Sequence, residues 1–168
     1  MRGARSAALP FVLVLAAACG YRVVTPYRAR GGVERIYVRA FENDSADPEL
    51  GGVVTGALRD ELARRGAAAG PEAPGQLQGT VRVVSGVPSS FSATSSRVAV
   101  EIRARLTKEG KLVRELVLQR GDNHLGGADP LEVEGRRATA LHKLARDAAR
   151  ELLRELEEDD RQPGAAKG

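Results

Sequence analysis

Alternation of apolar and polar residues predicts most of the strands in this chain. The clearest case is residues 97–106, where every second side chain is apolar and most of those between them are charged. Residues 35–41 alternate in the same way, with Ile36, Val38 and Ala40 on one face, and a weaker pattern follows at residues 77–83. Because successive side chains of a strand point to opposite faces of a sheet, this pattern predicts strands that are buried on one face only.

Two other segments have apolar residues at helical spacing. The first begins after Asp47-Pro48, a helix cap followed by a first-turn proline, and ends near Gly66. The second begins after Asp129-Pro130 and is longer. Its predicted apolar stripe consists of Val133, Leu141, Leu144, Ala145, Ala148, Leu152 and Leu156.

A tight turn at Lys108-Glu109-Gly110-Lys111 predicts a hairpin, with a returning strand over residues 112–120 that places Leu112, Leu116 and Leu118 on one face. The predicted order is strand, helix, three strands and helix. We therefore expect an α+β domain in which two helices pack on one face of a four-stranded mixed sheet. The charged face of the sheet is then left to solvent or to a partner.

The N-terminal residues have the pattern of a bacterial lipoprotein leader. Residues 1–18 combine two arginines with a short apolar stretch, and Leu15-Ala16-Ala17-Ala18-Cys19 resembles a lipobox, in which the cysteine is acylated and becomes the new N-terminus. The alternative is an ordinary leader with Cys19 as a buried thiol. We expect a signal peptide at 1–18, a lipidated linker at 19–32, a folded domain at 33–158 and a disordered tail at 159–168.

Composition excludes several classes of function. The net charge of +4 falls to +2 without the leader, only 4% of residues are aromatic and tryptophan is absent, so we expect no nucleic-acid partner. One cysteine and two histidines, His124 in a predicted glycine-rich loop and His142 on the last helix, provide no set of metal ligands. We expect no cofactor, no metal and no enzymatic activity.

Basic side chains gather on the face of the sheet that the helices do not cover. The predicted outward arginines are Arg97, Arg103, Arg105, Arg114 and Arg120. One interpretation is a solvated face that Glu101 and Glu115 partly neutralise. The other is a binding surface for an anion, because guanidinium groups bind phosphate in a bidentate geometry.

The order of these features resembles the LptE family of lipopolysaccharide-assembly lipoproteins. The resemblance rests on Cys19-Gly20-Tyr21-Arg22, then on residues 36–43 leading into Pro48-Glu49-Leu50, and finally on the helix, long strand and Ala-Leu-rich helix that follow. It implies an outer-membrane lipoprotein on the periplasmic side, held by acyl chains on Cys19. It also implies a plug of the LptD β-barrel that binds lipopolysaccharide, with Arg97, Arg103 and Arg105 as candidate contacts.

A second interpretation remains open. A structural lipoprotein of another envelope secretion or export complex could be built on a similar small module, because its opening strand and helix would have the same pattern. The two differ in the partner, which is a large β-barrel in the first case and a set of secretion components in the second.

Overall fold

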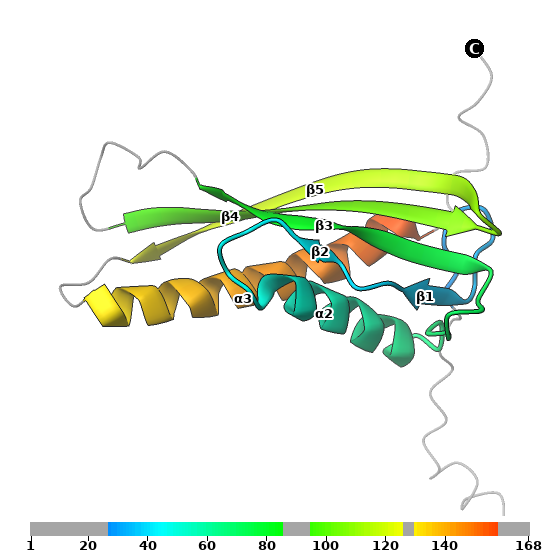
Figure 1. Cartoon of the computed structure of the whole chain (residues 1–168), viewed down its shortest axis with the longest axis horizontal. Helices are drawn as coiled ribbons and strands as arrows, with labels where there is room; N and C mark the ends of the chain where they lie inside the picture. The colour runs from blue at the N-terminus through cyan, green and yellow to red at the C-terminus, as the bar shows by residue number, and fades with distance from the viewer. Residues whose placement is uncertain (1–26, 86–94, 126–129, 158–168) are drawn as a thin grey trace, which may run out of the picture.

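The computed structural model describes residues 27–85, 95–125 and 130–157 (Figure 1). The predicted signal peptide, Cys19 and the predicted tail lie outside these residues. The elements are β1 (Ile36–Val38), β2 (Glu42–Asn43), α2 (Leu50–Arg64), β3 (Gly75–Ser85), β4 (Ser95–Lys108), β5 (Lys111–Leu125) and α3 (Pro130–Leu156).

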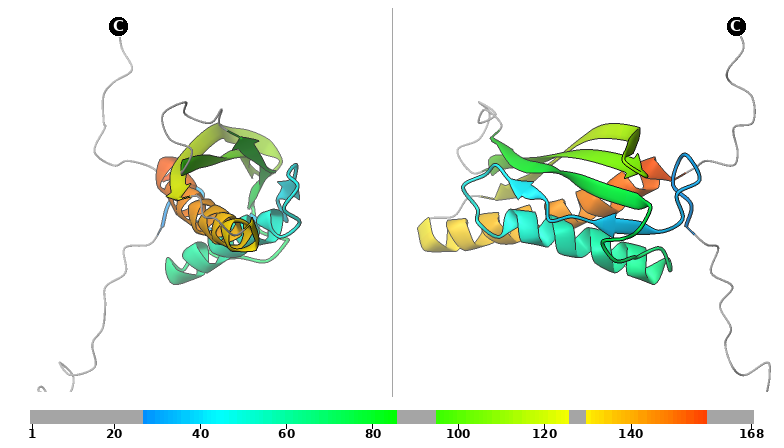
Figure 2. Two further views of the ribbon diagram at one scale, coloured as in Figure 1. Left: turned by 90° about the vertical axis from the view of Figure 1, so that its left-hand side faces the viewer. Right: turned by 45° about the vertical axis from the view of Figure 1, so that its right-hand side comes forward.

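The sheet is mixed and follows the order β1-β3-β4-β5, with β2 also paired to β3. Strands β1 and β2 run parallel to β3, whereas β3, β4 and β5 are antiparallel. Figure 2 shows the sheet curling over the two helices, which both lie on one side of it. The predicted α+β class and the arrangement of the helices are confirmed.

The first predicted strand is divided, so the described sheet has five strands instead of four. Pairing with β3 stops after Val38 and resumes at Glu42. In the interruption, Phe41 turns inward and is buried while Ala40 is exposed, contrary to the prediction for Ala40. The Thr55 hydroxyl on α2 accepts a hydrogen bond of 2.9 Å from the Phe41 N–H, which satisfies a backbone donor that the sheet leaves unpaired.

Strands β4 and β5 form the predicted hairpin, and Gly110 adopts a positive φ of 77° in its turn. A register shift between Leu106 and Thr107 reverses the alternation at the start of β5. As a result Leu112 is 57% exposed, and Val113 packs against the core instead, so the predicted inward position of Leu112 is wrong.

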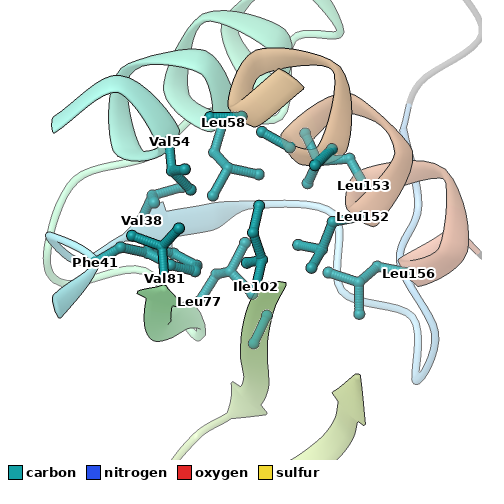
Figure 3. Packing of buried hydrophobic residues seen from close by; sticks show 14 of the residues in the cluster. Val38, Phe41, Val54, Leu58, Leu77, Val81, Ile102, Leu152, Leu153 and Leu156 are labelled. Atoms are coloured by element: carbon teal, nitrogen blue, oxygen red, sulfur yellow. The ribbon is translucent and has the colours of Figure 1, made fainter. Parts of the chain in front are cut away.

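The core lies between the concave face of the sheet and the two helices (Figure 3). The predicted stripe of α3 is buried there, except that the side chain of Val133 lies outside the described residues. The predicted stripe of α2 is buried at Leu50, Val54, Leu58 and Leu62, whereas Val53 and Ala57 are only partly buried. Sequence spacing missed Ala149 and Leu153, which are also fully buried. Helix α2 begins at Leu50 with Glu49 in the N-cap position and no side-chain cap, so the cap predicted at Asp47 is wrong by two residues. The Asp47 carboxylate instead accepts a hydrogen bond of 3.0 Å from the Glu49 N–H in the turn before α2.

Close approach of two strands explains Gly79 in the middle of β3. A Cβ at this position would lie 2.0 Å from the carbonyl oxygen of Arg103 on β4 and 2.7 Å from the Phe41 ring. The ring therefore occupies the volume that a side chain on β3 would otherwise need. Glycine at this position weakens the strand pattern in the sequence but is required by the packing.

The folded part reaches back to Tyr27, before the boundary expected at residue 33. Tyr27 is 2% exposed, and its hydroxyl donates a 3.0 Å hydrogen bond to the Leu153 carbonyl at the end of α3. The guanidinium of Arg65 lies 5.4 Å from the centre of the Tyr27 ring. Burial raises the pKa of the Tyr27 hydroxyl, so it remains a neutral donor at physiological pH.

Helix α3 is long but strongly amphipathic, with its charged side chains facing solvent. Of the helices in the described ranges, none has the combination of length and apolar character that crossing a bilayer requires.

Candidate functional site on the outer face of the sheet

The convex face of the sheet, opposite the helices, carries an open groove of about 470 Å³. Strand register places Gln78 beside Arg105, and Thr80 beside Arg103, across β3 and β4. The chain between β1 and β2 forms the other wall. The residues lining the groove are Arg39, Ala40, Glu42, Gln78, Gly79, Thr80, Arg103, Ala104, Arg105 and Glu115.

On this face, the nearly buried carboxylate of Glu101 binds two arginine side chains. Glu101 is only 8% exposed although it lies on the solvent side of the sheet, because two arginines cover it. Arg82 donates to both of its carboxylate oxygens at 3.0 Å, and Arg103 donates through Nε at 2.8 Å. One carboxylate thus faces two guanidinium groups, so the cluster keeps a net positive charge, and the contact with Glu101 orients the Arg103 side chain.

The other arginines of the groove are less constrained. Arg105 lies 3.4 Å from the carboxylate of Glu115, and both side chains are about half exposed, so the pair is weak. Arg39 donates a 3.4 Å hydrogen bond to the amide oxygen of Gln78, which is a neutral partner. An anion entering the groove would therefore compete with the weakest existing contacts at Arg39 and Arg105.

Two of the three predicted binding residues are brought together. Arg103 and Arg105 line the same groove, with side chains directed away from the core. Arg97 belongs to β4, but its side chain lies outside the described residues.

Two arginines predicted on the outward face lie on the opposite one. Arg114 pairs across the sheet with Leu106 and Arg120 with Val100, and both partners point into the core. Arg120 instead forms an ion pair with Glu151 on α3, at the rim of the sheet. The predicted outward position of Arg114 and Arg120 is therefore wrong, since residues opposite each other in a ladder share a face.

Sequence analysis did not single out Arg39, Gln78 or Thr80. The alternation of residues 35–39 places Arg39 on the face of the strand opposite to Ile36 and Val38, so the sequence did indicate an outward position for Arg39. The position of β1 next to β3, which brings Arg39 to Gln78, could not be deduced from that pattern.

His142 fills a structural position. His142 lies at the boundary between the helices, with Nε2 3.1 Å from a carboxylate oxygen of Asp47. His124 falls on β5 and not in the predicted loop, because β5 continues to Leu125; its side chain lies outside the described residues. In the described part of the chain, no group of three or more potential metal ligands comes together.

The stability of this face should depend on pH through Glu101. Hydrogen bonds from Arg82 and then Arg103 hold the pKa of Glu101 below its ordinary value of 4.5. A depressed pKa stabilises the folded state above about pH 4.5, and this contribution is lost as the pH falls through the lower folded-state value. We expect Glu101→Gln to lower the melting temperature at pH 7. As the pH is lowered further, the melting temperature of this variant should fall less steeply than that of the unmodified chain.

Thermal unfolding at a series of pH values checks this expectation. Glu115→Gln is the matched control, because Glu115 is about half exposed and its contact with Arg105 is long. A Glu101→Gln profile that is parallel to that of the unmodified chain would contradict the role assigned to this carboxylate.

Comparisons with known proteins agree with this architecture. A family model described as "LptE: Lipopolysaccharide-assembly" matches residues 33–156. A minor lipoprotein from Acinetobacter baumannii is similar in structure, with a TM-score of 0.55 and 9% identity over 73% of this chain and 91% of that one. The PelC dodecamer from Paraburkholderia phytofirmans gives a TM-score of 0.52 and 16% identity over 80% and 96% of the two chains. No curated protein matches the sequence.

Proposed function

Because this chain belongs to the LptE family of lipopolysaccharide-assembly lipoproteins, we propose that it plugs and helps to assemble an LptD-like β-barrel and binds lipopolysaccharide on its way to the outer leaflet. The observation that carries this proposal is the family match, which spans most of the domain, from Val33 to Leu156. A small, rigid domain with a polar outer face suits the water-filled interior of a large barrel. Its role is binding and assembly and not catalysis.

Purification of the tagged chain from detergent-solubilised outer membranes tests the barrel partner. We expect a large β-barrel protein to remain bound in a fixed ratio through size exclusion. Recovery of secretion or export components instead would favour the other interpretation, a structural lipoprotein of a different envelope complex. A chain that elutes without any partner would contradict both assignments and leave only the fold.

The proposed anchor is a set of acyl chains on Cys19, which holds the protein at the periplasmic side of the outer membrane. One acyl chain binds a bilayer weakly, whereas two or more hold a protein stably. We expect Cys19→Ala to abolish labelling with a radioactive fatty acid and to release the chain from the outer-membrane fraction. Normal membrane retention of this variant would contradict the lipobox assignment.

For lipopolysaccharide, the proposed contacts are the arginines of the outer groove, with Arg105 as a direct ligand beside Arg103. Lipid A carries phosphate groups, which match guanidinium in charge and geometry. The structure adds Arg39, whose present partner is a neutral amide. Arg103 is held by Glu101 and is assigned the secondary role of shaping the groove.

We expect Arg39→Gln/Arg105→Gln to weaken binding of purified lipopolysaccharide several-fold while leaving the melting temperature nearly unchanged. Both side chains are exposed, so their loss removes little packing. Lys143→Gln/Arg146→Gln removes the same charge from the exposed side of α3 and serves as the control. Equal affinity for all three proteins would show that the groove is only a solvated surface.

A further inference from the structure

The two edges of the sheet end differently, and the edge at β1 is closed. The Ile36 N–H donates to the carbonyl of Ala67 at 2.9 Å, and the Ile36 carbonyl accepts a hydrogen bond of 3.1 Å from the Ala69 N–H. The guanidinium of Arg59 on α2 donates to the Val38 carbonyl at 2.8 Å. These backbone groups, which β1 directs away from β3, therefore already have partners.

Strand β5 forms the opposite edge of the sheet, and this edge is open. The strand contains 15 residues, Lys111–Leu125, and pairs with β4 along one side. Along its other side, no backbone hydrogen bond from any described segment reaches residues 112–121. An unpaired edge of this length is a template on which another strand can add.

Hydrogen bonds elsewhere in the sheet determine which backbone groups of β5 face the open edge. The Val81 carbonyl accepts a hydrogen bond of 2.9 Å from the Asp44 N–H, so the backbone groups of Val81 face β2 and not β4. Ile102 lies opposite Val81, and in an antiparallel pair it consequently directs its own N–H and carbonyl to the other neighbour, β5. Its partner there is Leu118, whose N–H and carbonyl are thus used in the ladder.

This direction alternates along a strand, so the residues beside Leu118 point their backbone groups outward. The N–H and carbonyl groups that face the open edge are those of Glu115, Val117 and Gln119. Val117 also has a side chain that is 59% exposed on the convex face. Among the described residues the exposed large hydrophobic side chains are Leu112, Val117 and Leu131, and two of these belong to β5.

Charge at this edge indicates the chemistry of the strand that would add to it. Arg114 is half-buried on the concave face, and no carboxylate in the described part of the chain forms an ion pair with it. Arg120, on the same face, is by contrast neutralised by Glu151 of α3. A partly buried guanidinium without an anion favours a partner that supplies a carboxylate.

We propose that the open edge of β5 pairs with an extended segment of the barrel partner, which adds a strand beside Glu115, Val117 and Gln119. Side chains of the segment alternate, with a carboxylate toward Arg114 on the concave face and an apolar side chain beside Val117 on the convex face. The wall strands of a closed barrel are paired on both sides, so the segment belongs to a part of the partner outside that wall. This inference rests on the barrel partner in the proposed function.

Amide hydrogen exchange with residue resolution tests the pairing. It is measured on the isolated lipidated chain and on the complex purified with its barrel. We expect the amides of Glu115, Val117 and Gln119 to exchange several-fold more slowly in the complex, because they gain hydrogen-bond partners there. The amides of Leu116 and Leu118 are the internal control, since their ladder bonds to β4 protect them in both samples.

Two substitutions at one position separate backbone pairing from burial. Val117→Pro removes an outward N–H without removing a ladder bond, which an edge strand tolerates, whereas Val117→Thr keeps the N–H and the branched side chain. We expect Val117→Pro to lower the amount of barrel retained through size exclusion several-fold and Val117→Thr to retain most of it. The melting temperatures of the isolated variants show whether each has folded.

The outcomes distinguish this pairing from the proposed function. A barrel that is retained while exchange at residues 115, 117 and 119 stays fast would overturn the pairing and leave the barrel partner in place. Equal retention by Val117→Pro and the unmodified chain would overturn it as well. Slow exchange at these residues in an isolated chain that elutes as a dimer would assign the edge to a second copy instead. Absence of any barrel would overturn the proposed function and the pairing together.

Discussion

Replacing Gly79 with alanine is expected to destabilise the domain by about 3 kcal/mol or more, because the new methyl group has no space. Its Cβ would lie 2.0 Å from the Arg103 carbonyl oxygen, which is a backbone atom in the centre of the sheet and cannot rotate away. The Phe41 ring, at 2.7 Å, blocks the other direction. Relief of the clash requires β3 and β4 to separate, which breaks part of the ladder that holds the sheet together.

Gly56→Ala is the control for this prediction. Gly56 lies within α2, and a Cβ there would meet nothing within 4 Å. Since glycine is a poor helix former, this substitution should stabilise the domain by about 0.5–1 kcal/mol. Chemical denaturation of the two variants gives both values. A Gly79→Ala protein as stable as the unmodified chain would show that β3 and β4 can separate at little cost.

Where one periodic pattern continues without interruption, the sequence was sufficient to predict the element. Strand β4 alternates from Val100 to Leu106, and each of its predicted inward residues from Val98 to Leu106 is buried. Both helices behave in the same way, because an apolar stripe at helical spacing can be buried on one side only. These elements determine the two layers and hence the fold class.

The errors fall where the backbone departs from a regular period. The register shift after Leu106 inserts one residue on β5, and this moves Leu112 to the solvent face. The interruption between β1 and β2 has the same effect on Ala40 and Phe41. Neither irregularity could be predicted from alternation alone, because each depends on how the strand pairs with its neighbour.

The candidate site was partly predictable for a similar reason. Arg103 and Arg105 share a strand, so alternation alone places them on one face. Their relation to Glu101, Arg82 and Gln78 depends on the pairing of β3 with β4, which joins residues far apart in the chain. The sequence could therefore indicate a basic face but could not show that Glu101 holds Arg82 and Arg103, or that Arg39 completes the groove.

Tyr27→Ala should cost about 3–5 kcal/mol, a large part of the free energy of unfolding of a domain of this size. The substitution removes a ring that is 2% exposed and leaves the Leu153 carbonyl without its 3.0 Å donor. It also removes the surface on which Arg65 lies, 5.4 Å from the ring centre. Tyr27→Phe removes only the hydroxyl and should cost about 1 kcal/mol.

Chemical denaturation of Tyr27→Ala, with Tyr37→Ala as the control, separates this effect from a general loss of aromatic area. Tyr37 lies on β1 and is only half-buried, so its truncation should cost less. Equal losses would mean that the segment from Tyr27 to Val33 is attached too loosely to define where the chain enters the fold. A large effect would establish that the segment from Tyr27 to Val33 is an integral part of the folded domain, held at the C-terminal end of α3.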